Sequence, residues 1–218
     1  MLKKSHAKSR EQREKRKEQR AESKEQREGG WTACHSLRDE IWDYVNAHEY
    51  YMEVAMMKVG LGQDMHRLVK GRRFLLGGVE LPAKRGELGH SDGDVLAHAA
   101  CDAILGAAAL GDIGSLFPPS DPVWKDADSM GLLRSGFSLA KEAGWRLVSL
   151  DCVVSCEAPK VLPFRDAIRQ SLAEALEVSV DSVFVKGKTA EGLGPVGKGR
   201  AVQATVVCLL EKGMGMPE

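Results

Sequence analysis

Long hydrophobic runs are missing from this sequence. No stretch approaches the roughly 18 to 20 apolar residues that a helix needs to cross a bilayer. The first residues also lack the apolar core of a secretory signal, and they include glutamates, which transit peptides avoid. We therefore expect a cytoplasmic protein with no membrane contact.

Cysteines are few, and their spacing is uninformative. The five are an odd number and show none of the close pairs that mark structural zinc sites or small disulfide frameworks. They are Cys34, Cys101, Cys152, Cys156 and Cys208. This pattern indicates a reducing compartment.

Net charge is absent as well, since 31 Lys and Arg balance 31 Asp and Glu. The balance hides an asymmetry, because residues 1–28 hold eleven Lys or Arg against six Glu and almost nothing apolar. We expect a low-complexity tail there, disordered or forming a solitary helix. Contact with RNA through this basic tail is the alternative, and otherwise we expect no nucleic-acid partner.

The rest of the chain has a different organisation. Residues 29–56 are predicted to be a linker of unknown role, and residues 214–218 a short C-terminal tail. Between them, residues 57–213 alternate short β-rich runs with amphipathic stretches, and 43% of the whole chain is hydrophobic, enough for a core. We expect one compact domain in that range.

Strand and helix signals predict the order of elements in this domain. Strands are expected at residues 58–62, in a hairpin around Gly77-Gly78, and at residues 147–156, 183–187 and 201–210. Helices are expected from Asp92 to Leu110, from Asp128 or Ser129 to about Ala143, and from Pro163 to Leu176. Strands interleaved with helices predict an α/β (α+β) fold, in which a mixed β-sheet carries its helices on one face.

A metal site is predicted from three side chains. Asp64 and His66 directly follow the first predicted strand, and residues two apart in an extended chain point the same way. His98 is expected about two turns inside the next helix, which Ser91 or Asp92 would cap. Two His and one Asp, with a position left open, form the ligand set of a catalytic zinc rather than a structural one.

Each of these signals is weak alone, because a single His on an apolar helix is more often a core histidine. The helix nevertheless places Asp94, His98 and Asp102 four residues apart on one face. Asp102 is expected either to orient His98 or to cap or pair elsewhere.

Three loops offer groups suited to phosphate or a nucleobase. Residues 110–122 are predicted to form an exposed turn whose backbone N–H groups can hold phosphate or sugar oxygens. Residues 155–163 turn at Ala158-Pro159 and place Lys160 beside backbone groups that can read a base edge. Each segment also fits an ordinary connecting loop.

The third loop, residues 186–199, is the richest in polar groups. Thr189 offers a hydroxyl, Glu191 a carboxylate for Mg²⁺ or Mn²⁺, and Lys188 and Lys198 positive charges for phosphate. The loop lacks the GxxxxGK[ST] spacing of a Walker motif, and no helix is expected to follow it. Alone, it fits a glycine-rich connection between strands.

Five segments taken in order carry a resemblance to a known family: GLGQDMH, GGVELP, GHSDGDVLAHAACDAILGAAALGDIGSLFPPSD, EAPKVLP and VKGKTAEGLGPVGKG. Over about residues 57–213 the chain resembles the 2-C-methyl-D-erythritol 2,4-cyclodiphosphate synthases of the non-mevalonate isoprenoid pathway. The resemblance implies that the chain cyclises 4-diphosphocytidyl-2-C-methyl-D-erythritol 2-phosphate and releases CMP. It also implies a homotrimer with active sites between subunits.

The resemblance implies residue roles as well. Asp64, His66 and His98 would hold Zn²⁺, and Glu191 would help to place Mg²⁺ or Mn²⁺. His90 and Thr189 would be catalytic by stabilising the transition state. The residues expected to contact substrate are Asp64, Met65, His66, His90, Ser91, Asp112, Ile113, Gly114, Phe117, Pro118, Pro119, Ser120, Asp121, Cys156, Glu157, Ala158, Pro159, Lys160, Val161, Leu162, Lys188, Thr189, Ala190, Glu191, Pro195 and Lys198.

The sequence departs from the family pattern at two places. A Thr-Thr-rich turn is common before the metal-binding Glu, whereas Lys188 precedes Thr189 here, and Lys188 is predicted to contact a phosphate. Pro195 and Lys198 stand where an aromatic residue and an Arg are frequent near the trimer axis. A metal-dependent phosphohydrolase is the alternative enzyme class, because the same ligand set permits it.

Overall fold

A computed structural model describes residues 55–213, so the predictions for residues 1–54 and 214–218 lie outside it. The strands are β1 (Ala55–Val69), β2 (Phe74–Leu76), β3 (Val79–Leu81), β4 (Gly86–Leu88), β5 (Arg146–Ser155), β6 (Val183–Lys188) and β7 (Ala201–Gly213). The α-helices are α2 (Val95–Ala108), α3 (Ile113–Leu116), α4 (Ser129–Glu142), α5 (Arg165–Ala175) and α6 (Gly194–Gly197). Short 3₁₀ helices η1 (Pro122–Trp124), η2 (Leu162–Phe164) and η3 (Val180–Ser182) complete the set.

One five-stranded sheet forms the centre of the domain. Its order is β4-β1-β7-β5-β6, and β2 pairs with β3 in a separate hairpin across Gly77-Gly78. The pairs β4/β1, β1/β7 and β7/β5 are antiparallel, whereas β5/β6 is parallel. The predicted mixed sheet is therefore confirmed.

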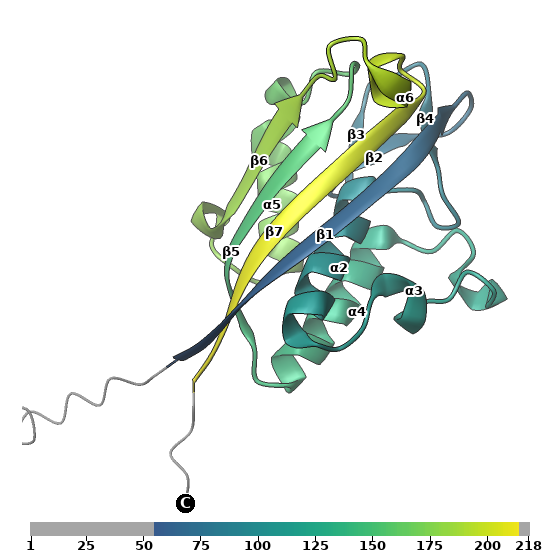
Figure 1. Ribbon diagram of the computed structural model, residues 1–218. Helices are drawn as coiled ribbons and strands as arrows, with labels where there is room; N and C mark the ends of the chain where they lie inside the picture. Colours follow the sequence, from purple (N-terminus) through teal and green to yellow (C-terminus); the bar gives the residue numbers. More distant parts are fainter. Residues whose placement is uncertain (1–54, 214–218) are drawn as a thin grey trace, which may run out of the picture. The chain divides into compact units, whose positions relative to one another are not determined.

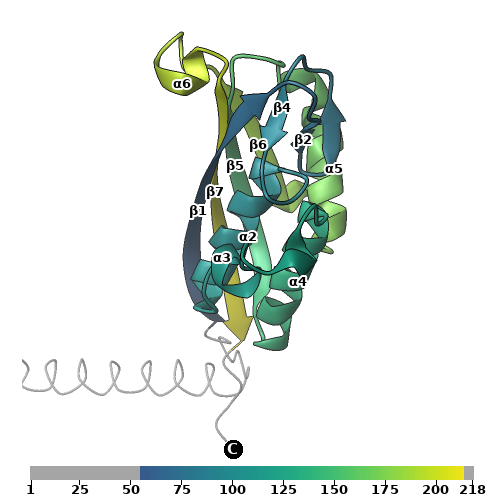
Figure 2. The ribbon, with the colours of Figure 1, turned by 90° about the vertical axis from the view of Figure 1, so that its right-hand side faces the viewer.

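Helices α2, α3, α4 and α5 lie on one face of this sheet, as predicted, whereas the short α6 lies on the other side at one end of the sheet (Figures 1 and 2). Helix α2 packs on β1 and β7, and α4 packs on α2. In β7, Val202, Ala204, Val206 and Cys208 are fully buried at every second position, which is the period of a strand with one covered face. The core thus lies between the sheet and its helical layer.

Two glycines let α2 approach β1 closely. A Cβ at Gly60 would lie 1.9 Å from the carbonyl oxygen of Ala103, and one at Gly62 would lie 2.0 Å from that of Ala99. Both contacts are with helix backbone, so neither position has room for a side chain. This close packing sets the distance between β1 and the middle of α2.

The first predicted strand was too short. β1 extends to Val69, so Asp64 and His66 lie inside the strand, opposite Ala204 and Val202 of β7, rather than after it. Pairing with the long β7 continues the strand beyond the point where the apolar signal fades.

The predicted cap of the following helix was also wrong. Asp94 is the N-cap of α2 and accepts hydrogen bonds from the backbone N–H groups of Leu96 and Ala97. Gly93 has φ +91°, which no helical residue adopts, so the helix cannot begin at Ser91 or Asp92. His98 therefore lies in the first turn of α2 and not two turns inside it.

The later elements agree more closely with the predictions. Asp128 caps α4 through the Met130 N–H, and Gly144 follows the helix with φ +84°. The helix predicted from Pro163 begins with the 3₁₀ turn η2 before α5 continues it. The short helix α6 lies inside the predicted glycine-rich loop of residues 186–199, and strand β7 follows that loop, so no helix follows it, as expected.

Candidate metal centre and active site

Asp64, His66 and His98 converge at one place. Asp64 and His66 share the helix-covered side of β1, and the first turn of α2 supplies His98. The Oδ2 atom of Asp64 lies 3.0 Å from His66 Nε2 and 3.1 Å from His98 Nδ1. One ligand atom from each residue lies within 4.8 Å of the other two. The predicted metal-binding group is therefore present.

Hydrogen bonds determine which nitrogen of each ring faces this group. His66 Nδ1 lies 2.7 Å from the carbonyl oxygen of Gly93, which can only accept, so Nδ1 carries a proton and Nε2 turns toward Asp64. His98 Nε2 lies 2.9 Å from the hydroxyl oxygens of Ser91 and Ser129, which leaves Nδ1 facing Asp64. Such outer contacts orient metal-ligating imidazoles. Two imidazole nitrogens and a carboxylate oxygen fit a divalent transition-metal ion with one position open.

The electrostatics of the group favour a charged pair. Burial opposes ionisation of Asp64, but hydrogen bonds with His66 and His98 hold the pKa of Asp64 well below its usual range. Burial likewise opposes the charged form of His66, yet hydrogen bonds with Asp64 and Glu87 raise the pKa of His66 to about 10. Metal binding at His66 therefore displaces a proton.

The other carboxylates predicted on this helix face have structural roles. Asp94 is fully buried and accepts from the N–H groups of Gly77 and Gly78 as well as capping α2. Asp102 accepts a 2.7 Å hydrogen bond from the Ile113 N–H. Asp102 therefore pairs elsewhere, which was the second of the two roles predicted for it, and does not orient His98. It anchors the start of α3 and makes no hydrogen bond to His98.

A cavity of about 230 Å³ opens beside the metal ligands. Its lining includes eight predicted residues, His66, His90, Ser91, His98, Ile113, Gly114, Phe117 and Pro119. Trp124 and Leu132 also line it and were not predicted. The rings of Phe117 and Trp124 meet edge to face at 4.9 Å between centroids, which gives the cavity an aromatic wall.

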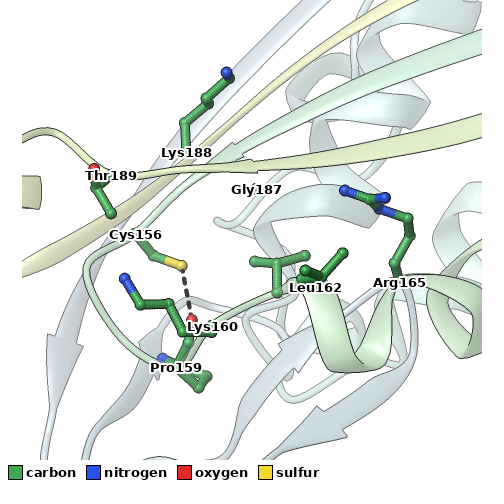
Figure 3. A pocket seen from close by; sticks show the side chains of 9 residues that line it. Cys156, Pro159, Lys160, Leu162, Arg165, Gly187, Lys188 and Thr189 are labelled. Atoms are coloured by element: carbon green, nitrogen blue, oxygen red, sulfur yellow. Dashed lines mark hydrogen bonds between the residues drawn. The ribbon is translucent and has the colours of Figure 1, made fainter.

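A second cavity, of about 220 Å³, lies where the 156–162 loop meets the end of β6 (Figure 3). The predicted residues Cys156, Pro159, Lys160, Val161, Leu162, Lys188 and Thr189 line it, together with Gly187 and Arg165, which were not predicted. The Cys156 thiol donates to the Pro159 carbonyl oxygen at 3.3 Å. Burial raises the pKa of that thiol to about 11, so Cys156 is not a thiolate nucleophile at neutral pH.

The remaining predicted contact residues line neither cavity: Asp64, Met65, Asp112, Pro118, Ser120, Asp121, Glu157, Ala158, Ala190, Glu191, Pro195 and Lys198. Asp112 and Asp121 act as N-caps of α3 and η1. Met65 is 49% exposed on the opposite side of β1 from the metal ligands. The structure of one chain therefore brings together only part of the predicted substrate site.

The loop at residues 189–192 is held by a carboxylate. Glu157 Oε1 accepts from the Ala190 N–H at 2.9 Å, so it ties this loop to the 156–162 loop. The Thr189 hydroxyl donates to the Glu191 carboxylate. The predicted catalytic hydroxyl and the predicted second metal ligand are thus neighbours.

Sequence reasoning missed several residues that support the metal ligands. Glu87 and Ser129 contact His66 and His98, and Gly93 supplies a carbonyl oxygen. None carries a sequence signal, because a Glu in a three-residue strand and a Ser at a helix start are both ordinary surface patterns. Only the tertiary structure shows that Glu87 and Ser129 are fully buried.

Within residues 55–213, each helix is too short or too polar to cross a bilayer. This finding agrees with the absence of long apolar runs in the sequence.

Comparisons with known proteins agree with this geometry. Residues 57–211 match the model of the YgbB family. A 2-C-methyl-D-erythritol 2,4-cyclodiphosphate synthase from Treponema denticola is 52% identical over 154 residues, covering 71% of this chain and 96% of the relative. A solved 2C-methyl-D-erythritol-2,4-cyclodiphosphate synthase in its CDP-bound form superposes with a TM-score of 0.65 at 40% identity, over 70% of this chain and 99% of that one.

A bifunctional protein from Campylobacter jejuni, IspDF, superposes with a TM-score of 0.70 at 37% identity. The match covers 72% of this chain but only 43% of the bifunctional protein, so the likeness concerns one part of it. The family match and the identity to curated relatives extend over most of the described residues. The chain therefore belongs to the YgbB family, the family of the 2-C-methyl-D-erythritol 2,4-cyclodiphosphate synthases.

Proposed function

We propose that this protein converts 4-diphosphocytidyl-2-C-methyl-D-erythritol 2-phosphate into 2-C-methyl-D-erythritol 2,4-cyclodiphosphate and CMP. The observation that carries the proposal is the cluster of Asp64, His66 and His98, two of which line a cavity, in a chain of the synthase family. The reaction is an intramolecular phosphoryl transfer, in which the 2-phosphate attacks the β-phosphorus and CMP departs.

Charge is the main obstacle to this ring closure. Two phosphate charges brought to about 4 Å repel by roughly 4 kcal/mol at an effective dielectric near 20. Zn²⁺ held by Asp64, His66 and His98, with Mg²⁺ or Mn²⁺ near Glu191, would supply positive charge and a Lewis acid. His90 lines the same cavity as His66 and His98, and it would contact the β-phosphate and help to orient it toward the attacking oxygen. Positioning is the other large contribution to phosphoryl transfer.

The second cavity suits the cytidine diphosphate end of the substrate. Lys160, Arg165 and Lys188 give its lining three positive charges, which complement a diphosphate. The Thr189 hydroxyl can donate to a phosphate oxygen there. A solved relative is described in its CDP-bound form, which supports a cytidine ligand for this family.

Product analysis tests the proposed reaction. The purified protein is incubated with the cytidyl-diphosphate substrate, Zn²⁺ and Mg²⁺, and the products are followed by phosphorus NMR. We expect CMP and a cyclic diphosphate in equal amounts, and addition of a chelator should stop the reaction. Release of inorganic phosphate would instead indicate a phosphohydrolase.

We also propose that the protein is a homotrimer with active sites between subunits. The sheet face opposite the helices carries Met57, Val59, Leu61 and Val207, which are 42% to 69% exposed. A contiguous apolar patch on a sheet face is typical of a protein–protein interface. Contact between copies through this face would also explain why one chain assembles only part of the predicted site.

A charge placed on this face should separate the subunits. Val59→Asp is expected to reduce the mass measured by light scattering from three chains to one, because an unpaired carboxylate is costly in an apolar interface. Leu139→Asp is the matched control, since Leu139 is an exposed apolar residue of α4 in the helical layer. Equal masses for Val59→Asp and the native protein would contradict this interface.

A further inference from the structure

Glu87 is an unusual residue for the interior of this domain. It lies in the short edge strand β4 and is 0% exposed. Its Oε2 atom lies 3.2 Å from His66 Nδ1 and accepts from the Val95 N–H at 2.9 Å. Its Oε1 atom is buried without a hydrogen-bond partner among residues 55–213. The reaction proposed above assigns no role to this carboxylate.

The surrounding backbone holds Glu87 against His66. A Cβ at Gly93 would lie 2.9 Å from the Glu87 carbonyl oxygen and 3.1 Å from its Cβ, so the two residues are in direct contact. Arg72 donates to the carbonyl oxygens of Glu87 and Ser91 at 3.2 and 2.8 Å, which fixes the segment between them. The His66 Nδ1–H therefore faces two fixed acceptors, the Gly93 carbonyl and the Glu87 carboxylate.

The contact with His66 gives this buried carboxylate a hydrogen-bond donor beside the metal ligands. A buried carboxylate with one unpaired oxygen is costly, and an apolar side chain of similar size would fill the space without that cost. A metal-bound imidazole is a strong hydrogen-bond donor, and a carboxylate behind it raises its basicity as a ligand. The hydrogen bond from a metal-bound His66 would therefore offset part of the cost of burying the Glu87 carboxylate.

We propose that Glu87 is a positioning residue for the metal centre: its carboxylate accepts from His66 Nδ1–H, aims Nε2 at the ion and strengthens its binding. The inference rests on the metal site of the proposed function but not on the reaction. Glu87 also contacts the first N–H of α2, so a purely structural role as a helix cap must be distinguished from it.

The distinction comes from two substitutions. Glu87→Gln retains an oxygen that can accept from the Val95 N–H but removes the charge that faces His66. Glu87→Leu removes both contacts and also the buried oxygen that has no partner. It therefore serves as a second variant for the test if Glu87→Gln does not fold. Asp166→Asn is the matched control, because Asp166 lies in the first turn of α5 and pairs with Arg169 rather than with a metal ligand.

The experiment measures the affinity of the metal-free full-length chain for Zn²⁺ by competition with a chromophoric chelator. We expect Glu87→Gln and Glu87→Leu to weaken Zn²⁺ binding by about 10- to 100-fold and Asp166→Asn to leave it unchanged. Native affinity in both Glu87 variants would overturn the proposal. Zn²⁺ binding that depends on Glu87 in a protein that forms no cyclic diphosphate would refute the proposed reaction and leave the role of Glu87 intact.

Discussion

Replacement of His66 with alanine is expected to remove the bound metal ion and nearly all turnover while the fold persists. His66 supplies one of three ligand atoms that lie within 4.8 Å of one another, and two ligands do not retain a transition-metal ion as three do. A Lewis acid at a phosphoryl group contributes several kcal/mol. Loss of about 4 kcal/mol corresponds to a fall in turnover of about a thousandfold.

The fold should survive this change because the ligand side chains lie at the edge of the core. Asp64 is 30% exposed in its side chain, and the main core cluster contains none of the three ligands. Zinc content by plasma mass spectrometry, circular dichroism and light scattering of the purified variant test the prediction together. Lys70→Ala, at an exposed position just after β1, is the control and should retain its metal. Full zinc occupancy in His66→Ala would refute the ligand assignment.

The layered architecture could be predicted because its signals are local. Alternating burial in the strands, the caps of α4 and the glycine pair of the hairpin all depend on neighbours along the chain. The limits of β1 and α2 could not be predicted so well. β1 is prolonged by pairing with β7, which is far away in the sequence, and α2 starts late because Gly93 adopts a positive φ.

The metal ligands could be predicted because two rules of spacing select them. Residues two apart in an extended chain share a side, and residues four apart share a helix face, which singled out Asp64, His66 and His98 although the predicted depth of His98 in its helix was wrong. The groups that orient those ligands could not be predicted, because Glu87 and Ser129 contact His66 and His98 only through tertiary packing. Arg165 was missed for the same reason, since only the packing of α5 beside β6 brings it to the second cavity.

Replacement of Gly62 with alanine is expected to lower both the stability of the domain and its affinity for zinc. Its missing side chain lets the Ala99 carbonyl of α2 approach β1, and a Cβ there would lie 2.0 Å from that oxygen. In Gly62→Ala the helix must move away, which separates His98 Nδ1 from Asp64 Oδ2, now 3.1 Å apart. Overpacking typically costs about 1–3 kcal/mol, and a clash with backbone belongs at the upper end or beyond.

Thermal unfolding and zinc content of Gly62→Ala measure both consequences. We expect the unfolding temperature to fall by about 6 to 12 °C, since about 3 kcal/mol corresponds to about 2–4 °C per kcal/mol at this chain length. Zinc affinity should fall with it, because the same helix shift opens the ligand cluster. Gly106→Ala is the matched control within α2, where a new Cβ meets nothing within 4 Å and alanine favours the helix, so that variant should gain stability. Native stability and zinc binding in Gly62→Ala would mean that the approach of α2 to β1 does not set the ligand spacing.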